Sequence, residues 1–326
     1  MGTDMRAVLV EECGGPDALV MRDVPKPVAG PTDVIVKVAV SGVNFIDVYF
    51  RTGLYKVPPP VVLGSEAAGL VDSVGSAVTE FAPGDRVAYA MHRGSYAEFA
   101  QVPAAQLVKI PDLVSFQHAA AVMLQGMTAH YLTRSTFPLK AGDTCLVHAA
   151  AGGTGALVVQ MAKASGARVI GTVSTPEKAA IARAAGVDEV IFYTEQDFAA
   201  EARRLTGGRG VDVVYDGVGK TTFEKGLDAL RPRGMMVLFG AASGAVASFD
   251  PQILNPKGSL YVTRPSLAHY VGSREELLWR ATEVLDMVAH NTLDVRIDAT
   301  FPLAQAADAH RALEGRKSTG KFLLAI

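Results

Sequence analysis

The first part of the chain alternates short apolar segments with turns. Between residue 6 and about residue 125, glycine and proline interrupt the apolar segments, and the turn Pro83-Gly84-Asp85 precedes one of them. Short β-type segments bounded by turn residues indicate an all-β structure. The pattern therefore predicts a barrel-like β domain, with strands at residues 7–10, 34–40, 67–74 and 87–90.

From Asp143 onward, apolar runs of four to seven residues alternate with longer helical stretches. Such alternation predicts a parallel sheet covered on both faces by helices, which makes the fold class α/β. The expected strands are residues 144–148, 168–173, 190–193, 211–216, 235–240 and 260–263. The expected helices are residues 155–165, 176–185, 198–205 and 223–230. We expect a Rossmann-type, doubly wound sheet of six strands.

The C-terminal tail has a pattern of its own. It begins near Arg274 with an amphipathic helix through Ala289, followed by a strand near Val295, a helix at 304–313 and a strand at 322–324. Because six strands already complete a doubly wound sheet, we assign the tail to the first domain. The predicted division is residues 1–126 with 265–326 for the β-rich domain, and residues 127–264 for the parallel-sheet domain.

Composition and charge exclude several classes of protein. Of 326 residues, 49% are hydrophobic and 20% charged, and 31 Lys and Arg against 33 Asp and Glu give a net charge of −2. This balance provides no polycationic surface for nucleic acid or an anionic membrane. No clean apolar run reaches the roughly 18 residues of a membrane span. Cys13 and Cys145 are too few for a disulfide scaffold. We expect a cytoplasmic protein without membrane or nucleic-acid partners.

A glycine-rich segment lies between the first strand and the first helix of the parallel-sheet domain. His148-Ala149-Ala150-Ala151-Gly152-Gly153-Thr154-Gly155 matches the dinucleotide-binding fingerprint, with alanine in place of its first glycine. Such a bend lets the backbone approach a pyrophosphate at the free N–H groups of a helix. The preceding strand and following helix supply the context that the motif needs. We therefore predict that residues 152–155 (Gly152, Gly153, Thr154 and Gly155) bind the cofactor, whereas His148 is expected to be a hydrogen-bonded packing residue.

The end of the second strand indicates which cofactor binds. NAD enzymes place Asp or Glu about 20 residues after the motif, where it binds the ribose 2′-hydroxyl. This sequence has Thr172-Val173-Ser174-Thr175-Pro176-Glu177-Lys178 there, with no acid at the strand tip. Ser174 and Lys178 suit a 2′-phosphate, and Glu177 is expected in a capping box begun by Ser174. The prediction is NADPH. The alternative is that Ser174 only caps the helix and Lys178 is a solvated charge.

Four segments of the sequence resemble one known family. They are Asn44-Phe45-Ile46-Asp47 and residues 64–69, 149–155 and 258–267. Together they look like the quinone oxidoreductase (zeta-crystallin) branch of the medium-chain dehydrogenase/reductase superfamily, over essentially the whole chain. The resemblance implies a GroES-like β-barrel catalytic domain built from both termini, an inserted Rossmann domain that binds NADPH, a cleft at their junction and usually a homodimer.

The chain departs from the zinc enzymes of this superfamily. Zinc alcohol dehydrogenases that resemble it have a cysteine ligand where Asn44 lies and a His-Glu pair where Ser65-Glu66 lies. Neither Cys13 nor Cys145 falls in a ligand spacing, and the 7 histidines form no cluster in the sequence. We therefore expect no metal. Without a Lewis acid to polarise an oxygen, the substrate should be an acceptor that needs little such help.

Quinones meet this requirement, because hydride from the nicotinamide gives a delocalised hydroquinone anion. The expected function is zinc-independent reduction of a quinone by NADPH in the interdomain cleft. One alternative is an enone or alkenal double-bond reductase, whose hydride adducts are enolates that need electrostatic support and a proton. Another is a nucleotide-binding crystallin or RNA-binding protein, although the sequence has no Arg/Lys stripe and no aromatic recognition motif.

The resemblance also implies roles for particular residues. It places Tyr49, Tyr55 and Arg264 toward the substrate as catalytic residues, and the following residues against the cofactor: Asn44, Phe45, Ile46, Asp47, Thr128, Tyr131, Phe239, Gly240, Ala241 and Arg316. A tyrosine or a bound water would deliver the proton, and Arg264 would steady an oxyanion.

Several of these residues have a plainer alternative. The tyrosines of a β-rich domain are often packing residues, and Arg264 would otherwise join a surface ion pair. We prefer to interpret Asp47 as a residue that hydrogen-bonds within its loop rather than one that takes up protons. Arg316 would otherwise be a helix-end charge. Tyr193, at the end of the third strand of the parallel sheet, either flanks the adenosine phosphate or is an exposed aromatic residue.

The last predicted strand of the parallel sheet, residues 260–263, is apolar and ends the strand series. A bare strand of this kind would be an adhesive edge. Pairing with its own symmetry mate would cover it. We therefore predict a twofold homodimer with a continuous sheet.

Overall fold

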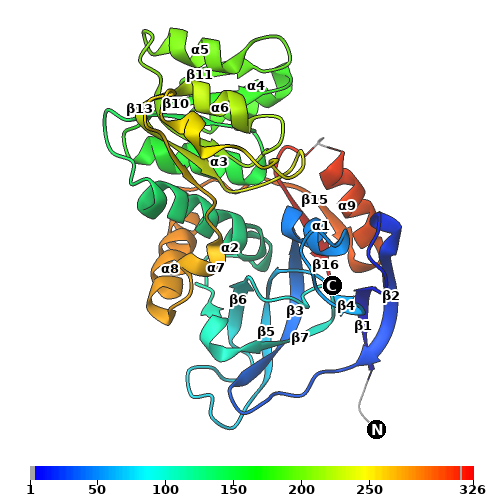
Figure 1. Ribbon diagram of the computed structural model, residues 1–326. Coiled ribbons are helices and arrows are strands. Elements are labelled where there is room, and N and C mark those ends of the chain that lie inside the picture. The colour runs from blue at the N-terminus through cyan, green and yellow to red at the C-terminus, as the bar shows by residue number, and fades with distance from the viewer. Residues whose placement is uncertain (1–3, 316–317) are drawn as a thin grey trace. The chain divides into compact units, whose positions relative to one another are not determined.

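The computed structural model describes residues 4–315 and 318–326, and Figure 1 labels their elements. The chain divides into two compact units: unit 1 comprises residues 1–127 with 271–326, and unit 2 comprises residues 128–270. The sequence placed these boundaries after residues 126 and 264, whereas the contacts place them after residues 127 and 270. The identification of each unit with a separate domain stays a prediction.

Unit 2 contains a six-stranded sheet in the order β11-β10-β9-β12-β13-β14. All neighbouring strands in it are parallel. The strands are β9 (Thr144–Val147), β10 (Arg168–Val173), β11 (Glu189–Phe192), β12 (Val211–Asp216), β13 (Leu230–Leu238) and β14 (Tyr261–Thr263). The predicted doubly wound sheet is confirmed, and its strand order reverses beside β9.

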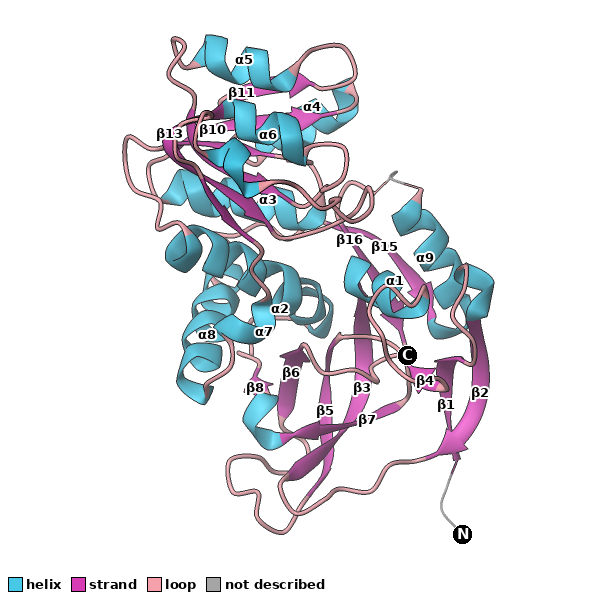
Figure 2. Ribbon diagram, in the orientation of Figure 1, coloured by secondary structure: helices cyan, strands magenta, loops and turns pink. Residues whose placement is uncertain are grey.

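Helices of unit 2 connect and cover these strands, as Figure 2 shows. They are α3 (Gly153–Ala164), α4 (Pro176–Ala184), α5 (Phe198–Leu205) and α6 (Phe223–Ala229), whereas the short α7 (Leu267–Tyr270) follows the last strand. Right-handed crossovers on either side of β9 put α3 and α4 on one face and α5 and α6 on the other. Buried Leu146, Ile170, Val214 and Met236 contribute to the core of this unit.

Unit 1 is built mainly from antiparallel strands. Its larger sheet runs β15-β16-β3-β5-β6-β8, with β7 pairing β3, and a smaller one runs β2-β1-β4. The C-terminal strand β16 pairs antiparallel with β3, so the tail completes the sheet of the N-terminal segment. The strands are β1 (Asp4–Val10), β2 (Leu19–Pro25), β3 (Asp33–Val43), β4 (Val61–Val62), β5 (Glu66–Val74), β6 (Arg86–Ala90), β7 (Phe99–Pro103), β8 (Val108–Lys109), β15 (Ile297–Pro302) and β16 (Lys321–Ala325).

The remaining helices of the described structure lie partly in unit 1 and partly in unit 2. The α-helices are α1 (Phe45–Arg51), α2 (Phe116–Tyr131), α8 (Arg274–Ala289) and α9 (Ala306–Glu314), and the unit boundary falls inside α2. The short helices are η1 (Pro16–Ala18), η2 (Ala104–Gln106), η3 (Leu132–Thr136, a π-helix), η4 (Pro251–Leu254) and η5 (Leu303–Gln305).

The strand expected near Val295 is present and begins two residues further on, at Ile297. One expectation about local structure was wrong. The helix expected to begin with a Ser174 cap begins instead with Thr175, whose Oγ1 accepts the Lys178 N–H at 3.3 Å. Because Pro176 then occupies the first helical position, Lys178 rather than Glu177 is the third helical residue. The capping box of Ser174 and Glu177 is therefore absent.

Candidate active site

The glycine-rich loop joins β9 to α3. Ala149 adopts a left-handed conformation with φ of 51°, and the turn closes with Gly152 N donating to Ala149 O at 2.8 Å. A Cβ at Gly155 would overlap this same oxygen, and one at Gly152 would lie 3.2 Å from it. The N-cap Gly152 has no side chain to bond the first N–H groups of α3. A helix N-terminus whose first N–H groups have no side-chain cap fits the diphosphate of a dinucleotide.

The parallel sheet brings the other candidate residues of unit 2 to one edge. Carboxyl ends of parallel strands meet at the same side of a sheet, which is where such folds bind ligands. In spatial order, Tyr193 follows β11, Ser174 follows β10, the glycine-rich loop follows β9, Phe239 follows β13 and Arg264 follows β14. This order is compatible with an extended dinucleotide whose 2′-phosphate lies near β10 and β11.

After β10, Ser174 and Lys178 flank the helix cap Thr175. Both side chains are half-buried; Ser174 precedes the cap residue Thr175, and Lys178 lies in the first turn of α4. Tyr193 is 47% exposed, and its N–H donates to Val173 O at 3.2 Å. The binding of a 2′-phosphate by Ser174, Lys178 and Tyr193 stays a prediction.

Aromatic rings pack around several of the residues that the sequence predicts to border the nicotinamide. The Tyr131 ring is buried and stacks on Tyr270, with centroids 4.2 Å apart. Thr128 is also buried, one turn earlier in α2. Phe239 lies so close to Gly217 that a Cβ there would be 2.9 Å from the ring. Gly240 and Ala241 follow Phe239 in the same loop after β13.

The loop after β12 is organised by a residue that the sequence reasoning missed. Asp216 is buried, and its Oδ1 accepts the main-chain N–H groups of Val218 at 2.7 Å and Gly219 at 3.0 Å. Its Oδ2 accepts the Thr222 hydroxyl at 2.8 Å. An acid at the end of an apolar strand, followed by glycine, is the sequence signal for such a turn.

In unit 1 the candidate residues cluster around α1. Asn44 precedes the helix, and its N–H donates to Asp47 Oδ2 at 3.1 Å, which is one half of a capping box. Tyr49 is buried, whereas Tyr55 is 38% exposed, and their rings meet edge-on with centroids 5.3 Å apart. The Phe45 and Tyr49 ring centroids are 6.3 Å apart. The structure thus brings these rings together, with Ile46 in the same helical turn. Arg264, which belongs to unit 2, donates to Pro265 O at 3.3 Å.

Asp47 is a buried carboxyl surrounded by donors. Its Oδ1 accepts the Ser65 hydroxyl at 2.6 Å, and its Oδ2 accepts the Tyr96 phenol at 3.4 Å. Burial raises the pKa of Asp47 to about 7, although the Ser65 bond and the Lys321 charge oppose the rise. Asp47 therefore hydrogen-bonds within its own loop, through the Asn44 N–H, and to side chains outside it, and its raised pKa lets the carboxyl take up a proton near neutral pH. Its contact with the cofactor stays a prediction.

A chain of buried groups extends from Asp47 to α9, and sequence reasoning missed it. The Arg51 guanidinium lies 3.0 Å from His310 Nδ1 and contacts Glu314 at 2.8 Å. Because arginine can only donate, His310 Nδ1 accepts, and its proton lies on Nε2, 3.0 Å from the Tyr96 oxygen. Burial and the Arg51 charge lower the pKa of His310 to about 3, so the ring is neutral.

A buried lysine contacts Asn44 and Glu66, two of the positions at which this sequence was expected to differ from the zinc enzymes. Lys321 Nζ lies 2.7 Å from Asn44 Oδ1 and 2.5 Å from Glu66 Oε2. The sequence reasoning missed Lys321. Its one sequence signal is a charge placed directly before the apolar run 322–324.

The donors at this position do not fit zinc. Asn44 and Ser65 offer an amide and a hydroxyl in place of the thiolate and imidazole that zinc prefers. The Asn44 and Glu66 oxygens bind the ammonium of Lys321, and Ser65 Oγ donates to Asp47. Within residues 4–315 and 318–326, no group of three His, Cys, Asp or Glu side chains is arranged to hold a metal. We derive no catalytic step through zinc.

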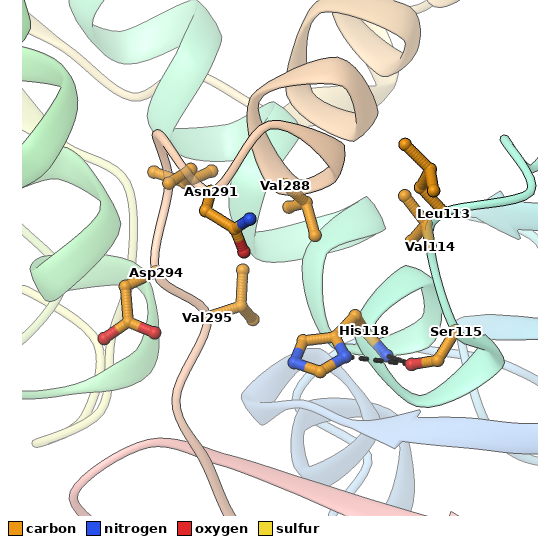
Figure 3. Close-up of a pocket in the computed structure, with 9 residues that line it drawn as sticks. Leu113, Val114, Ser115, His118, Val288, Asn291, Asp294 and Val295 are labelled. Carbon is orange, nitrogen blue, oxygen red and sulfur yellow. Dashed lines mark hydrogen bonds between the residues drawn. The ribbon is translucent and has the colours of Figure 1, made fainter.

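A cavity elsewhere in unit 1 involves other residues. It has a volume of about 260 Å³, and its lining includes Ser115, His118, Val288 and Asp294. Figure 3 shows the hydrogen bond between Ser115 Oγ and His118 Nδ1, which measures 2.8 Å. Ser115 Oγ also accepts the His118 N–H at 3.1 Å, so it caps the start of α2. The described residues that line this cavity include none of the predicted site residues.

One predicted site residue and the question of a membrane span remain. Arg316, expected to reach the cofactor phosphate, lies outside the described residues. Among the helices that the structure describes, none has both the length and the apolar character needed to cross a membrane.

Comparisons with known proteins agree with this arrangement. The family described as "Alcohol dehydrogenase GroES-like domain" matches residues 30–112, and "Zinc-binding dehydrogenase" matches residues 153–295. The quinone oxidoreductase of Pseudomonas aeruginosa is 47% identical over 313 residues, which cover 95% of this chain and 96% of that protein. The 2-haloacrylate reductase of a Burkholderia species is 44% identical over 329 residues, covering 98% of each.

A solved structure shows the same likeness in three dimensions. Escherichia coli quinone oxidoreductase complexed with NADPH matches with a TM-score of 0.96 at 43% identity, covering 98% of this chain and 100% of that one. The GroES-like segment, the six-stranded Rossmann sheet and identity over nearly the full length therefore agree, and the chain belongs to the quinone oxidoreductase family of the medium-chain dehydrogenase/reductase superfamily.

Proposed function

We propose that this protein is an NADPH-dependent quinone reductase that works without zinc. The observation that carries the proposal is the bare loop at the N-terminus of α3, found in a chain 47% identical to a quinone oxidoreductase. One matching family is described as zinc-binding. In this chain, however, the Asn44 and Glu66 oxygens bind the Lys321 ammonium, and the Ser65 hydroxyl bonds the Asp47 carboxyl. NADPH supplies the hydride when it is bound.

Residues of both units have proposed roles in this reaction. In unit 2, residues 152–155 bind the diphosphate, and Ser174, Lys178 and Tyr193 bind the 2′-phosphate side. Thr128, Tyr131 and residues 239–241 border the nicotinamide half. In unit 1, residues 44–47 support the nicotinamide, and Tyr49 and Tyr55 face the substrate. Arg264 stabilises the negative charge that develops on the substrate oxygen.

A second candidate activity is the reduction of an activated carbon–carbon double bond. The observation that favours it is the 44% identity to a 2-haloacrylate reductase, which covers 98% of each chain. Hydride addition to such a substrate gives an enolate, which needs a stabilising cation and a proton. Arg264 and the exposed phenol of Tyr55 would supply these groups.

The substrate class is tested by following NADPH oxidation at 340 nm. We expect turnover with 1,4-benzoquinone and 9,10-phenanthrenequinone, slower turnover with crotonaldehyde and 2-chloroacrylate, and none with simple alcohols in the presence of NADP⁺. Fastest turnover with 2-chloroacrylate would favour the double-bond reductase. Alcohol oxidation that is lost on treatment with a chelator would contradict the proposal.

The cofactor assignment is tested by Lys178→Ala. Loss of one charge-assisted contact to a phosphate should weaken NADPH binding by about tenfold or more, and NADH binding by no more than about twofold. The control is Lys225→Ala, because Lys225 is an exposed lysine of the same unit paired with Asp197 at 2.8 Å. Equal losses for both cofactors in Lys178→Ala would show that this side chain does not contact the 2′-phosphate.

We also propose a homodimer and a cytoplasmic location. Within the described structure, β14 pairs with β13 on one side only, and Tyr261 on it is 57% exposed. An uncovered edge of this kind favours pairing with a second copy. Cys13 and Cys145 are both free thiols, as expected in a reducing compartment.

A further inference from the structure

The strand β16 carries a lysine whose side chain lies inside unit 1. Lys321 is 1% exposed, and its partner Glu66 is fully buried. Lysine and glutamate are almost never fully buried unless they are paired, because removing a charge from water is costly. The 2.5 Å contact between Lys321 Nζ and Glu66 Oε2 is therefore a charged cross-link inside the fold.

The same ion pair holds the Asn44 side chain at both ends. Asn44 Oδ1 accepts from Lys321 Nζ at 2.7 Å, and Asn44 Nδ2 donates to Glu66 Oε2 at 2.9 Å and to Gly42 O at 3.4 Å. A rotated amide would place its NH₂ group against the ammonium and its oxygen against the carboxylate. The charges therefore allow one orientation of this side chain.

Glu66 is itself fixed by the backbone around it. Its second oxygen, Oε1, accepts the main-chain N–H of Leu124 in α2 at 2.5 Å. A Cβ at Gly42 would overlap Glu66 Oε2, so the carboxylate lies directly against the β3 backbone. The ammonium of Lys321 thus joins the β3–α1 turn and the start of β5 to the C-terminal strand.

We propose that Lys321 is a positioning residue of the reductase: its ammonium ion, paired with Glu66, holds Asn44 and thereby residues 44–47 in the place that the nicotinamide requires. This inference rests on the proposed function, which puts residues 44–47 beside the nicotinamide. Lys321 transfers no proton or electron in this role. It supplies a covalently attached cation that ties together chain segments distant in sequence.

The test compares Lys321→Met with the double variant Glu66→Gln/Lys321→Met. Methionine keeps most of the length of lysine without its charge. In the single variant, Glu66 is left as an unpaired buried carboxylate, so a lower Tm is expected. The double variant removes both charges and should fold with a Tm close to that of the original protein.

Two readouts separate positioning from stability in the double variant. We expect the Kd for NADPH to stay within about twofold, because the phosphate contacts belong to unit 2. The fluorescence emission of bound NADPH, which reports the nicotinamide environment, should change, and kcat should fall by about tenfold or more. A folded double variant with the original emission and kcat would overturn the proposal.

A double-mutant cycle asks whether Lys321 acts through Asn44. If it does, adding the Glu66→Gln/Lys321→Met pair to Asn44→Ala should lower kcat no further than Asn44→Ala alone does. A further fall in kcat, equal to the product of the two separate effects, would show that Lys321 does not act through Asn44. Glu66→Gln alone keeps the bond from Lys321 to Asn44, and the emission of bound NADPH should then stay nearly unchanged. If the double variant does not fold, the two single variants decide the question: an emission that is unchanged in Lys321→Met as well as in Glu66→Gln would overturn the proposal.

The matched control is Lys109→Met, in the same unit. Lys109 pairs with Asp85 at 2.9 Å, but its side chain is 60% exposed, so emission and kcat should not change. The fluorescence experiment requires only NADPH binding. If the original protein reduces no quinone, the proposed function fails, while the emission of the variants still tests the positioning role.

Discussion

At the scale of single residues, the Asp47 carboxyl carries the clearest dependence on pH. Its pKa is raised from 3.8 to about 7 by burial. At a pH between these two pKa values, the Asp47 carboxyl has lost its proton in the unfolded chain but keeps it in the folded protein. The folded state then binds more protons, so stability is highest below the unfolded pKa and falls as pH rises toward 7. The fall from this group is about 1.4 kcal/mol per pH unit within that window.

The variant Asp47→Asn removes this titration while keeping the local hydrogen bonds. Its amide oxygen can accept from the Asn44 N–H, and its NH₂ group can donate to Ser65 Oγ. Relative to the original protein, the variant should therefore gain stability from pH 5 to pH 7. The measurement is guanidinium unfolding of both proteins across that range. Parallel stability curves would show that the Asp47 pKa is not raised.

The candidate residues of unit 2 could be identified from the sequence, whereas the buried network of unit 1 could not. A nucleotide loop is a local pattern, because residues 149–155 and the flanking strand and helix adjoin in the chain. Lys321 is 255 positions from Glu66 and 277 from Asn44, so only the pairing of β16 with β3 brings them together. The Ser174 cap failed for a local reason: two hydroxyl residues adjoin, and Pro176 selects the second as the cap.

At the scale of elements, one arginine fastens α1 to α9. Arg51 is 1% exposed and binds both carboxylate oxygens of Glu314, at 2.9 and 2.8 Å. It also donates to Gly14 O at 3.1 Å and to His310 Nδ1 at 3.0 Å. Arg51→Met leaves these acceptors without their donor. Because Arg51 is buried but the Glu314 side chain is 33% exposed, we expect the free energy of unfolding to fall by about 2 kcal/mol, less than for a fully buried pair.

The control for this prediction lies on α9 itself. Arg311 pairs with Asp308 at 2.7 Å, but both side chains are about half exposed, at 45% and 57%. Arg311→Met should therefore change the unfolding free energy by less than about 1 kcal/mol. Chemical denaturation of the two variants compares them directly. Similar losses would mean that the buried Arg51 contacts contribute no more than an exposed ion pair.

Periodicity in the sequence was sufficient for some elements and not for others. The predicted segments 198–205, 211–216 and 274–289 coincide with α5, β12 and α8, because each has a clear apolar pattern. The short helix α1 was not predicted. It depends on the buried Arg51 and Asp47 contacts rather than on a long apolar stripe. The bounds of β15 were not predicted, only its presence near Val295, because most of its residues are only half-buried, without clean alternation.

At the scale of the whole molecule, the remaining prediction concerns the uncovered edge of the parallel sheet. In the described structure β14 is the last strand of its sheet, and it is only three residues long. Its Val262 packs partly against the core, whereas Tyr261 is 57% exposed. Antiparallel pairing of two copies about Val262 would place Tyr261 of one opposite Thr263 of the other. The main-chain groups at the edge would then be satisfied, and the exposed ring would be covered.

Lysine substitutions at this edge test the pairing. Tyr261→Lys with Thr263→Lys would set like charges opposite each other at both ends of the shared strand, which opposes association. Sedimentation at micromolar concentration should show a dimer for the original protein and a monomer for the variant. The matched control is Tyr193→Lys, because Tyr193 is another exposed aromatic of unit 2, located after β11 at the other end of the sheet. It should leave the dimer intact. A monomeric original protein, or a variant that remains dimeric, would exclude β14 as the interface.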